Sequence, residues 1–132
     1  MFLTQEVTVC SAHRLHNGNL SDEENKKIFG RCNNVHEHNY KVTVTIQGEP
    51  DHVTGMFCSV VALEEAVKKT VKPMDHQHVD KDIQWFKDRV CTMENIAIYL
   101  WENLKKNLTE PDQLYEVKVA ERETVSVIYR GN

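Results

Sequence analysis

Hydrophobic and polar residues alternate along several stretches of this chain, and this alternation predicts β-strands. It is clearest from Tyr40 to Ile46, where a β-branched run places valine or isoleucine at every second position. A further apolar run at residues 56–60 follows turn-forming residues at 48–51, so it is predicted to be the returning strand of a hairpin. Strands are predicted at residues 3–10, 39–47, 56–60, 114–121 and 124–129.

Two longer stretches instead place apolar residues at helical spacing. Residues 59–70 and 92–107 carry them at intervals of three and four, and a proline follows each stretch. Thr92 can cap the second of these helices. A short surface helix is also predicted from Ser21, because Glu24 stands three positions later in a capping-box pattern.

The order of these elements is typical of an α+β fold. The strands can pair as hairpins into a four-stranded antiparallel sheet, and the two long helices can cover one face of it. The chain has 132 residues, of which 40% are hydrophobic, so residues 1–132 are expected to form a single domain with its own core. The other face of the sheet remains free for water or a partner, which predicts a homo-oligomer.

Composition argues against several classes of function. The formal charge is -4 and the 16 Lys and Arg residues are scattered, so no nucleic-acid partner is expected. No stretch reaches the roughly 20 apolar residues of a membrane span, and the first residues lack the pattern of a secretory signal. No membrane partner is therefore expected, and the predicted location is cytoplasmic. The four cysteines show no C-x-x-C spacing and are predicted to be free thiols.

Candidate chemistry begins at His36-Glu37-His38, just before the clearest strand. Side chains two residues apart on a strand share a face, so both imidazoles should point the same way. Neutral imidazole is a common zinc ligand, and the pair can supply two corners of a tetrahedral site. His13 is the best candidate for a third ligand, with His16 in reserve. An isolated histidine pair is more often structural or exposed than metal-binding, and that interpretation competes with the zinc site.

Several motifs resemble those of the 6-pyruvoyltetrahydropterin synthase family, over nearly the whole chain. Residues 11–15 resemble the family's first zinc-ligand segment, and residues 36–42 resemble its zinc strand. The polar segments at 20–25 and 29–34, which lead to the cysteine, resemble those of the eukaryotic members. Further matches occur in the family's order at Gly55-Met56, Asp75-His76, Thr92 to Trp101 and Glu121.

The resemblance implies the tunnelling fold, in which subunits trimerise through their sheets into a barrel and stack as a hexamer, a dimer of trimers, with active sites at subunit interfaces. It also implies a zinc-dependent lyase that converts 7,8-dihydroneopterin triphosphate to 6-pyruvoyltetrahydropterin, with loss of triphosphate, in tetrahydrobiopterin biosynthesis. Carried over by position, the site would consist of the zinc ligands His13, His36 and His38, the base Cys32 with its partners Asp75 and His76, the pterin anchor Glu121, and the substrate-pocket residues Thr92 and Glu94.

This reaction needs residues of these types. A carbon-bound proton beside a hydroxyl is weakly acidic, so a zinc ion with three neutral ligands is needed to draw charge from that oxygen. A cysteine can accept the proton once a neighbouring histidine favours its thiolate. A carboxylate such as Glu121 can accept two N–H groups of a pterin ring in a fork.

The chain departs from the eukaryotic pattern around the catalytic cysteine. Three residues separate Cys32 from His36 where five are usual, and Glu37 replaces a glycine. The shorter spacing resembles the bacterial 6-carboxytetrahydropterin synthases, so their reaction on the same substrate is an alternative. A pterin-binding homologue without turnover is another. Met93 also stands where a second threonine is common. For the triphosphate, nearness in sequence suggests Arg14, Arg31 and Lys41.

Overall fold

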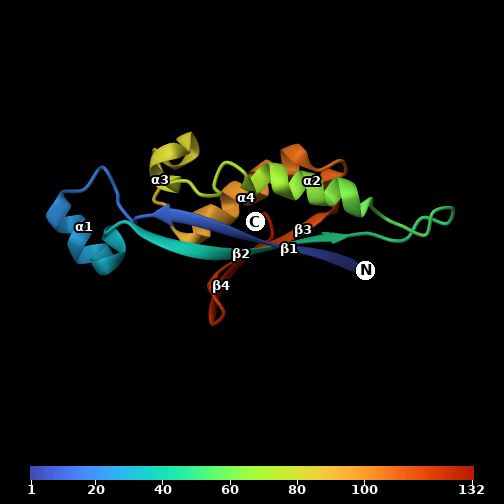
Figure 1. Ribbon diagram of the computed structural model, residues 1–132, viewed down its shortest axis with the longest axis horizontal. Coiled ribbons are helices and arrows are strands. Elements are labelled where there is room, and N and C mark those ends of the chain that lie inside the picture. The colour runs from blue at the N-terminus through green and yellow to red at the C-terminus, as the bar shows by residue number, and fades with distance from the viewer.

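The structure, a computed structural model, describes residues 1–132. Its elements are β1 (Phe2–His13), α1 (Asp22–Phe29), η1 (Gly30–Asn33), β2 (His36–Gln47), α2 (Val60–Val71), α3 (Val79–Asp82), η2 (Gln84–Phe86), α4 (Met93–Asn107), η3 (Pro111–Gln113), β3 (Leu114–Arg122) and β4 (Val125–Tyr129). The strands form one antiparallel sheet in the order β1-β2-β3-β4. Helices α2 and α4 lie on one face of it, while α1 projects from one end (Figure 1). The predicted α+β fold is confirmed.

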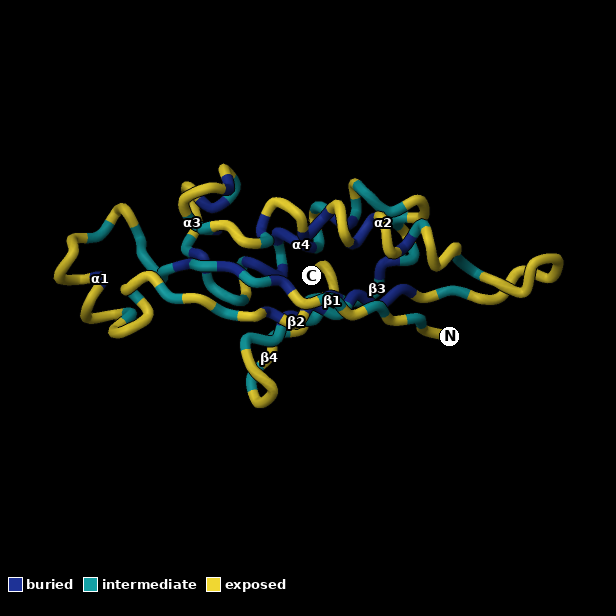
Figure 2. Tube along the Cα trace, in the orientation of Figure 1, coloured by how far each residue is buried: buried dark blue, intermediate teal, exposed yellow.

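The sheet has one apolar face and one polar face because its residues alternate. Along β2, Tyr40, Val42 and Val44 are buried beneath the helices, whereas Glu37 and Lys41 between and before them are exposed. Buried segments accordingly gather between the sheet and the helices in Figure 2. The core therefore occupies one side of the sheet, and the opposite face carries polar side chains.

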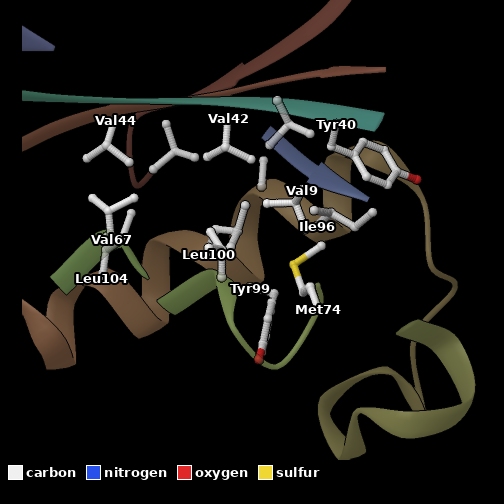
Figure 3. Packing of buried hydrophobic residues seen from close by; sticks show 14 of the residues in the cluster. Val9, Tyr40, Val42, Val44, Val67, Met74, Ile96, Tyr99, Leu100 and Leu104 are labelled. Carbon is white, nitrogen blue, oxygen red and sulfur yellow. The ribbon is translucent and has the colours of Figure 1, made fainter. Parts of the chain in front are cut away.

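The core is a layer of strand residues packed against α2 and α4. Figure 3 shows Val9, Val42 and Val44 facing side chains of the two helices, including Val67 and Leu100. All five are at most 1% exposed. Tyr40 lies at the end of this cluster with its hydroxyl directed away from the apolar side chains (Figure 3). Tyr40 therefore marks the end of the apolar core, with its polar group outside the cluster.

The predicted helix starts are confirmed by their caps. Ser59 accepts a hydrogen bond from the Ala62 amide at the start of α2. At α1, the Ser21 hydroxyl accepts from the Glu24 amide, and the Glu24 carboxylate accepts from the Ser21 amide, so the capping box is complete. The buried Asn25 side chain then holds the preceding loop through the backbone carbonyls of that loop.

The predicted strand at residues 56–60 is wrong. The chain leaves β2 in a loop closed by Asp51, whose side chain accepts hydrogen bonds from the backbone amides of Val53 (2.8 Å) and Thr54 (2.9 Å). One edge of β2 is taken by β1 and the other by β3. No edge of β2 is left for a returning strand, so local apolar character could not become sheet pairing.

Strands β1 and β2 are longer than predicted, and the added residues carry the candidate ligands. The alternation suggested strands over 3–10 and 39–47, whereas the ladder continues to a last pair formed by His13 and His36. His13 is therefore inside a strand rather than just after one.

No helix combines the length and the apolar composition needed to cross a bilayer. The cytoplasmic location and the single domain stay predictions.

Candidate metal centre and active site

The register of β1 and β2 brings three histidines together. His13 pairs with His36 and Ser11 pairs with His38, so the three imidazoles lie on the helix-bearing face at one end of the sheet. The ring centroids are 4.5 Å apart for His13 and His36, 4.8 Å for His36 and His38, and 5.2 Å for His13 and His38. The predicted ligand triad is thus gathered by strand pairing, and the reserve residue, His16, lies outside it, beside Asn33.

Glu121, on the neighbouring strand β3, completes a group of four. One ligand atom from each of the three histidines and one carboxylate oxygen all lie within 4.8 Å of one another. Glu121 Oε1 is 2.9 Å from His38 Nε2, yet this buried nitrogen has no hydrogen bond of acceptable geometry. A buried nitrogen without a hydrogen bond and a carboxylate beside it suit a metal ion. The donor set fits zinc.

Backbone carbonyls orient two of the imidazoles. His13 Nδ1 lies 2.8 Å from the Cys91 carbonyl, and His36 Nδ1 lies 2.7 Å from the Asn34 carbonyl. A carbonyl only accepts, so in both rings Nδ1 carries the proton and Nε2 keeps its lone pair. This arrangement is the usual support for a metal-binding histidine. No local sequence pattern predicted either carbonyl contact.

Tyr40 also belongs to this site, and sequence reasoning missed it. Its hydroxyl is 3.0 Å from His13 Nε2, and burial raises the pKa of the phenol well above its ordinary value. The neutral hydroxyl therefore donates to the nitrogen that would bind a metal. Alternation was an available signal, since Tyr40 shares a strand face with His36 and His38.

The surroundings of the cluster favour the neutral form of two imidazoles, His13 and His38. Burial, and then the nearby His36, lower the pKa of His13 from 6.5 to about 4. Burial is also the main cause that lowers the pKa of His38. A neutral imidazole binds metal and a protonated one does not, so the surroundings that depress these pKa values also prepare the ligands.

We expect the metal-free protein to lose stability as the pH falls from 6.5 towards 4. The pKa of His13 is lower in the folded chain than in the unfolded chain, so the unfolded chain takes up the proton first. This difference removes about 3 kcal/mol of unfolding free energy by pH 4. Urea unfolding of zinc-free protein at pH 7, 5.5 and 4.5 measures it. The variant His13→Asn should show a shallower pH dependence, and equal slopes would contradict the assignment.

Asp75 and His76 form a pair, but away from the histidine cluster. His76 Nδ1 lies 3.1 Å from Asp75 Oδ2, and the segment runs along the edge of β1 that faces away from β2. The His76 amide donates to the Cys10 carbonyl (2.6 Å), and the Cys10 amide donates to Asp75 Oδ1 (3.1 Å). Cys10 precedes His13 by three residues, about 10 Å along a strand. The pair therefore lies at a distance from the metal ligands of its own chain.

The backbone at His76 is unusual. Its φ of 59° makes it the one non-glycine residue with a positive φ, a conformation that costs about 1–2 kcal/mol for an L-residue. The contacts with Cys10 hold this conformation, while 77% of the His76 side chain is exposed. Strain of this kind is typical of functional positions. The histidine is thereby presented at the edge of the sheet.

Cys32 is exposed on η1, and its thiol is not among the four clustered ligand atoms. Its carbonyl accepts a hydrogen bond from the Leu15 amide (2.7 Å), which fixes η1 beside the end of β1. The shortened connection from Cys32 to His36 remains tied at its other end through the Asn34 carbonyl. The other predicted catalytic residue thus lies close to the cluster along the chain but outside it.

Thr92 and Glu94 stand at the start of α4. The Thr92 hydroxyl accepts a hydrogen bond from the Asn95 amide (3.1 Å) and caps the helix, whereas Glu94 is exposed in the first turn. Thr92 directly follows Cys91, whose carbonyl orients His13. The structure therefore gives Thr92 a structural role at the edge of the site, and the predicted substrate contacts of both residues stay predictions.

Replacing Thr92 by alanine should lower the unfolding free energy by about 1 kcal/mol, because the amide of Asn95 loses its acceptor. Thr92→Ser keeps the hydroxyl and should restore most of the loss. Urea unfolding of the metal-free proteins measures the difference. Equal midpoints for the alanine and serine variants would show that the cap contributes nothing.

Comparisons with known proteins identify the family of this chain. The sequence profile of the family described as 6-pyruvoyl tetrahydropterin synthase matches residues 2–132. The chain belongs to this family. The 6-pyruvoyl tetrahydrobiopterin synthase of Drosophila melanogaster is 43% identical over 133 residues, covering 98% of this chain and 79% of the fly protein. The Homo sapiens protein of the same name is 43% identical over 132 residues, covering 98% and 90%.

A solved structure extends the likeness to three dimensions. The Caenorhabditis elegans 6-pyruvoyl tetrahydropterin synthase superposes with a TM-score of 0.96 at 38% identity, covering 100% of this chain and 96% of that one. The predicted family membership is confirmed, and with it the prediction that the chain is an enzyme of this synthase family. The names of the relatives connect the family to tetrahydrobiopterin synthesis.

Proposed function

We propose that this chain is a zinc-dependent lyase that converts 7,8-dihydroneopterin triphosphate to 6-pyruvoyltetrahydropterin, with loss of triphosphate. The observation that carries the proposal is the cluster of His13, His36, His38 and Glu121, whose ligand atoms lie within 4.8 Å of one another. Family membership supplies the reaction class, and the cluster supplies a site that suits its metal.

The three histidines would hold the zinc through their Nε2 atoms. Carbonyls occupy Nδ1 of His13 and His36, His38 Nε2 has no hydrogen bond, and at His13 Nε2 the metal would replace the Tyr40 hydroxyl. When bound there, zinc supplies Lewis acidity to the side-chain hydroxyls of the substrate, which makes the protons on the carbons that bear them easier to remove. With Nε2 of His13 on the metal, the Tyr40 hydroxyl, which lies 3.0 Å from that nitrogen, would be free to donate its hydrogen bond to another acceptor beside the cluster. Cys32 would accept the proton, and His76, oriented by Asp75, would favour its thiolate.

The separation of these groups supports an active site built from more than one subunit. Asp75 and His76 lie beside Cys10 at the edge of β1, three residues before His13, and neither contributes an atom to the histidine cluster of the same chain. Strands β1 and β4 are the two edges of the sheet, so copies can join edge to edge. We propose a barrel of three sheets in a hexameric dimer of trimers, in which the Asp75–His76 pair of one subunit serves the cysteine of its neighbour.

Glu121 has two candidate roles, the pterin anchor and a fourth metal ligand. The second role is considered because Glu121 Oε1 lies 2.9 Å from His38 Nε2. We expect Glu121→Gln to retain about one zinc per chain, because three imidazoles suffice. The KM for substrate should rise by at least about tenfold, since an amide cannot accept two N–H groups in a fork. Metal analysis and steady-state kinetics measure the two effects. Loss of zinc on dialysis would instead identify Glu121 as a ligand.

The products of the reaction test the proposal directly. Zinc-loaded protein is incubated with 7,8-dihydroneopterin triphosphate and the products are identified by mass spectrometry. Triphosphate and a pyruvoyl pterin are expected. Acetaldehyde and a carboxypterin would establish the 6-carboxytetrahydropterin synthase reaction, which the three-residue spacing between Cys32 and His36 favours. Unchanged substrate with zinc bound would leave a pterin-binding homologue without turnover.

A further inference from the structure

A polar cavity of about 550 Å³ is lined in part by residues that adjoin the histidine cluster in sequence. It is formed by the chain that follows β1 and by the segment from α3 to the start of α4. Its volume is in the range of small-molecule sites, but only three of its fourteen lining residues are hydrophobic, so it suits a highly polar ligand. Nothing in the role of the histidine cluster accounts for this cavity.

Positive charge dominates the lining. Two carboxylates face four basic side chains, although the whole chain carries a formal charge of -4. None of the four basic side chains forms an ion pair within the chain. The basic side chains are Arg14, Lys81, Lys87 and Arg89, and the acidic ones are Asp80 and Asp88. Unpaired cations that line one cavity attract anions, and phosphates above all.

One of the two carboxylates is already occupied. Asp80 Oδ1 accepts a hydrogen bond from the Arg14 amide (3.2 Å) and lies 2.8 Å from His78 Nε2. Arg89 is also held in place, since its guanidinium stacks 4.1 Å above the Trp85 ring and donates to the Trp85 carbonyl (3.0 Å). The lining therefore combines fixed groups with the exposed Lys81 and Lys87.

Several residues that line the cavity are neighbours in sequence of residues in or beside the histidine cluster. Arg14 follows His13, and Val35 precedes His36, while Val90 precedes Cys91, whose carbonyl orients His13. Consecutive Cα atoms are about 3.8 Å apart, so the wall of the cavity begins one residue from each of these positions.

The proposed substrate has this shape. Its side chain carries two hydroxyls on adjacent carbons and the triphosphate on the oxygen of the next carbon. When the hydroxyls are at the metal ligands, the polyanion must lie in a site that adjoins them. We propose that the cavity lined by Arg14, Lys81, Lys87 and Arg89 binds the triphosphate of the substrate, an inference that rests on the proposed function.

Of the three basic residues that nearness in sequence suggested for the triphosphate, the structure places only one at the cavity. Arg14 lines the cavity. Lys41 alternates with Tyr40 on β2, so it points to the opposite face of the sheet, where it lies 3.8 Å from Glu6. Arg31 is exposed on η1 and does not line the cavity. The lysines that do line it come from a segment more than sixty residues further along the chain.

Binding of inorganic triphosphate to the zinc-free protein tests the site without chelation of the metal. Isothermal titration calorimetry should detect binding that weakens with added salt, because the lysines that line the cavity are exposed. Lys81→Ala and Lys87→Ala should each weaken it by about tenfold, and the double variant by more. Lys41→Ala is the matched control and should bind like the wild type. Equal affinity in the double variant, or no binding to the wild type, would overturn the proposal.

Kinetics separate this inference from the proposed function. In the Lys81→Ala, Lys87→Ala double variant the KM for substrate should rise while zinc content stays unchanged. Normal turnover of the double variant with an unchanged KM would overturn the assignment of the cavity to the triphosphate, while the proposed lyase activity would stand. No turnover by the wild type, together with triphosphate binding that the double variant loses, would overturn the lyase and leave a polyanion site.

Discussion

His38→Ala should abolish metal binding and turnover together. Its Nε2 is a buried nitrogen without a hydrogen bond, and it lies in the group of ligand atoms within 4.8 Å of one another. With two imidazoles left, the site cannot reach the three protein ligands of a catalytic zinc. We expect the zinc content to fall from about one per chain to well below that, and turnover to fall by on the order of 10³-fold or more.

The measurement combines metal analysis with product release, and it needs a histidine control. His52→Ala is suitable because His52 is exposed in the loop after β2 and takes no part in the cluster. It should keep both zinc and activity. Circular dichroism should show that His38→Ala remains folded, since the fold rests on an apolar core elsewhere in the sheet. Full zinc content in folded His38→Ala would show that the cluster is not the metal site.

Cys32→Ala should leave the zinc in place and remove the chemistry. The thiol is not among the clustered ligand atoms, so its loss does not change the coordination of the metal. Removal of a general base typically costs 10²–10⁴-fold, and we expect a loss of about 10³-fold in kcat with little change in KM. Steady-state kinetics at matched zinc content measure it.

Cysteine controls make the Cys32 result specific. Cys58→Ala removes a half-buried thiol that packs against the core beside α2, and burial raises the pKa of that thiol above its ordinary value. It should keep full activity. Cys32→Ser tests whether a hydroxyl can replace the thiol, and it should remain nearly as impaired as the alanine variant. Activity in Cys32→Ala within tenfold of the wild type would assign the proton transfer to another group.

The chain departs from the family pattern at the Cys32–His36 connection and at Glu37, and the structure shows the surroundings of both. The connection between Cys32 and His36 is two residues shorter than usual, yet both of its ends are fixed, at the Leu15 amide and at His36 Nδ1. Catalysis is sensitive to displacements of about 1 Å, so the product experiment and the cysteine variants test this segment most directly. Glu37 is exposed on the polar face of the sheet, opposite the ligands, and its side chain does not reach the cluster.

Local patterns predicted most of the elements because each depends on a few neighbouring residues. The capping box at Ser21 and the cap at Thr92 are formed by amides three residues away, and the alternation from Tyr40 to Ile46 follows from the two faces of a strand. The run at 56–60 was misjudged for the complementary reason. It had the composition of a strand, but a strand needs an edge, and both edges of β2 were taken.

Residue types and short spacings were enough to predict the family, the α+β fold and the three candidate histidine ligands. The folded chain was needed to show that β1 extends to His13, that Glu121 and Tyr40 join the cluster, and that Asp75 and His76 lie apart from it. It also brought Lys81 and Lys87 to the same cavity as Arg14. These relations depend on strand register and on contacts between residues distant along the chain, which no local pattern encodes.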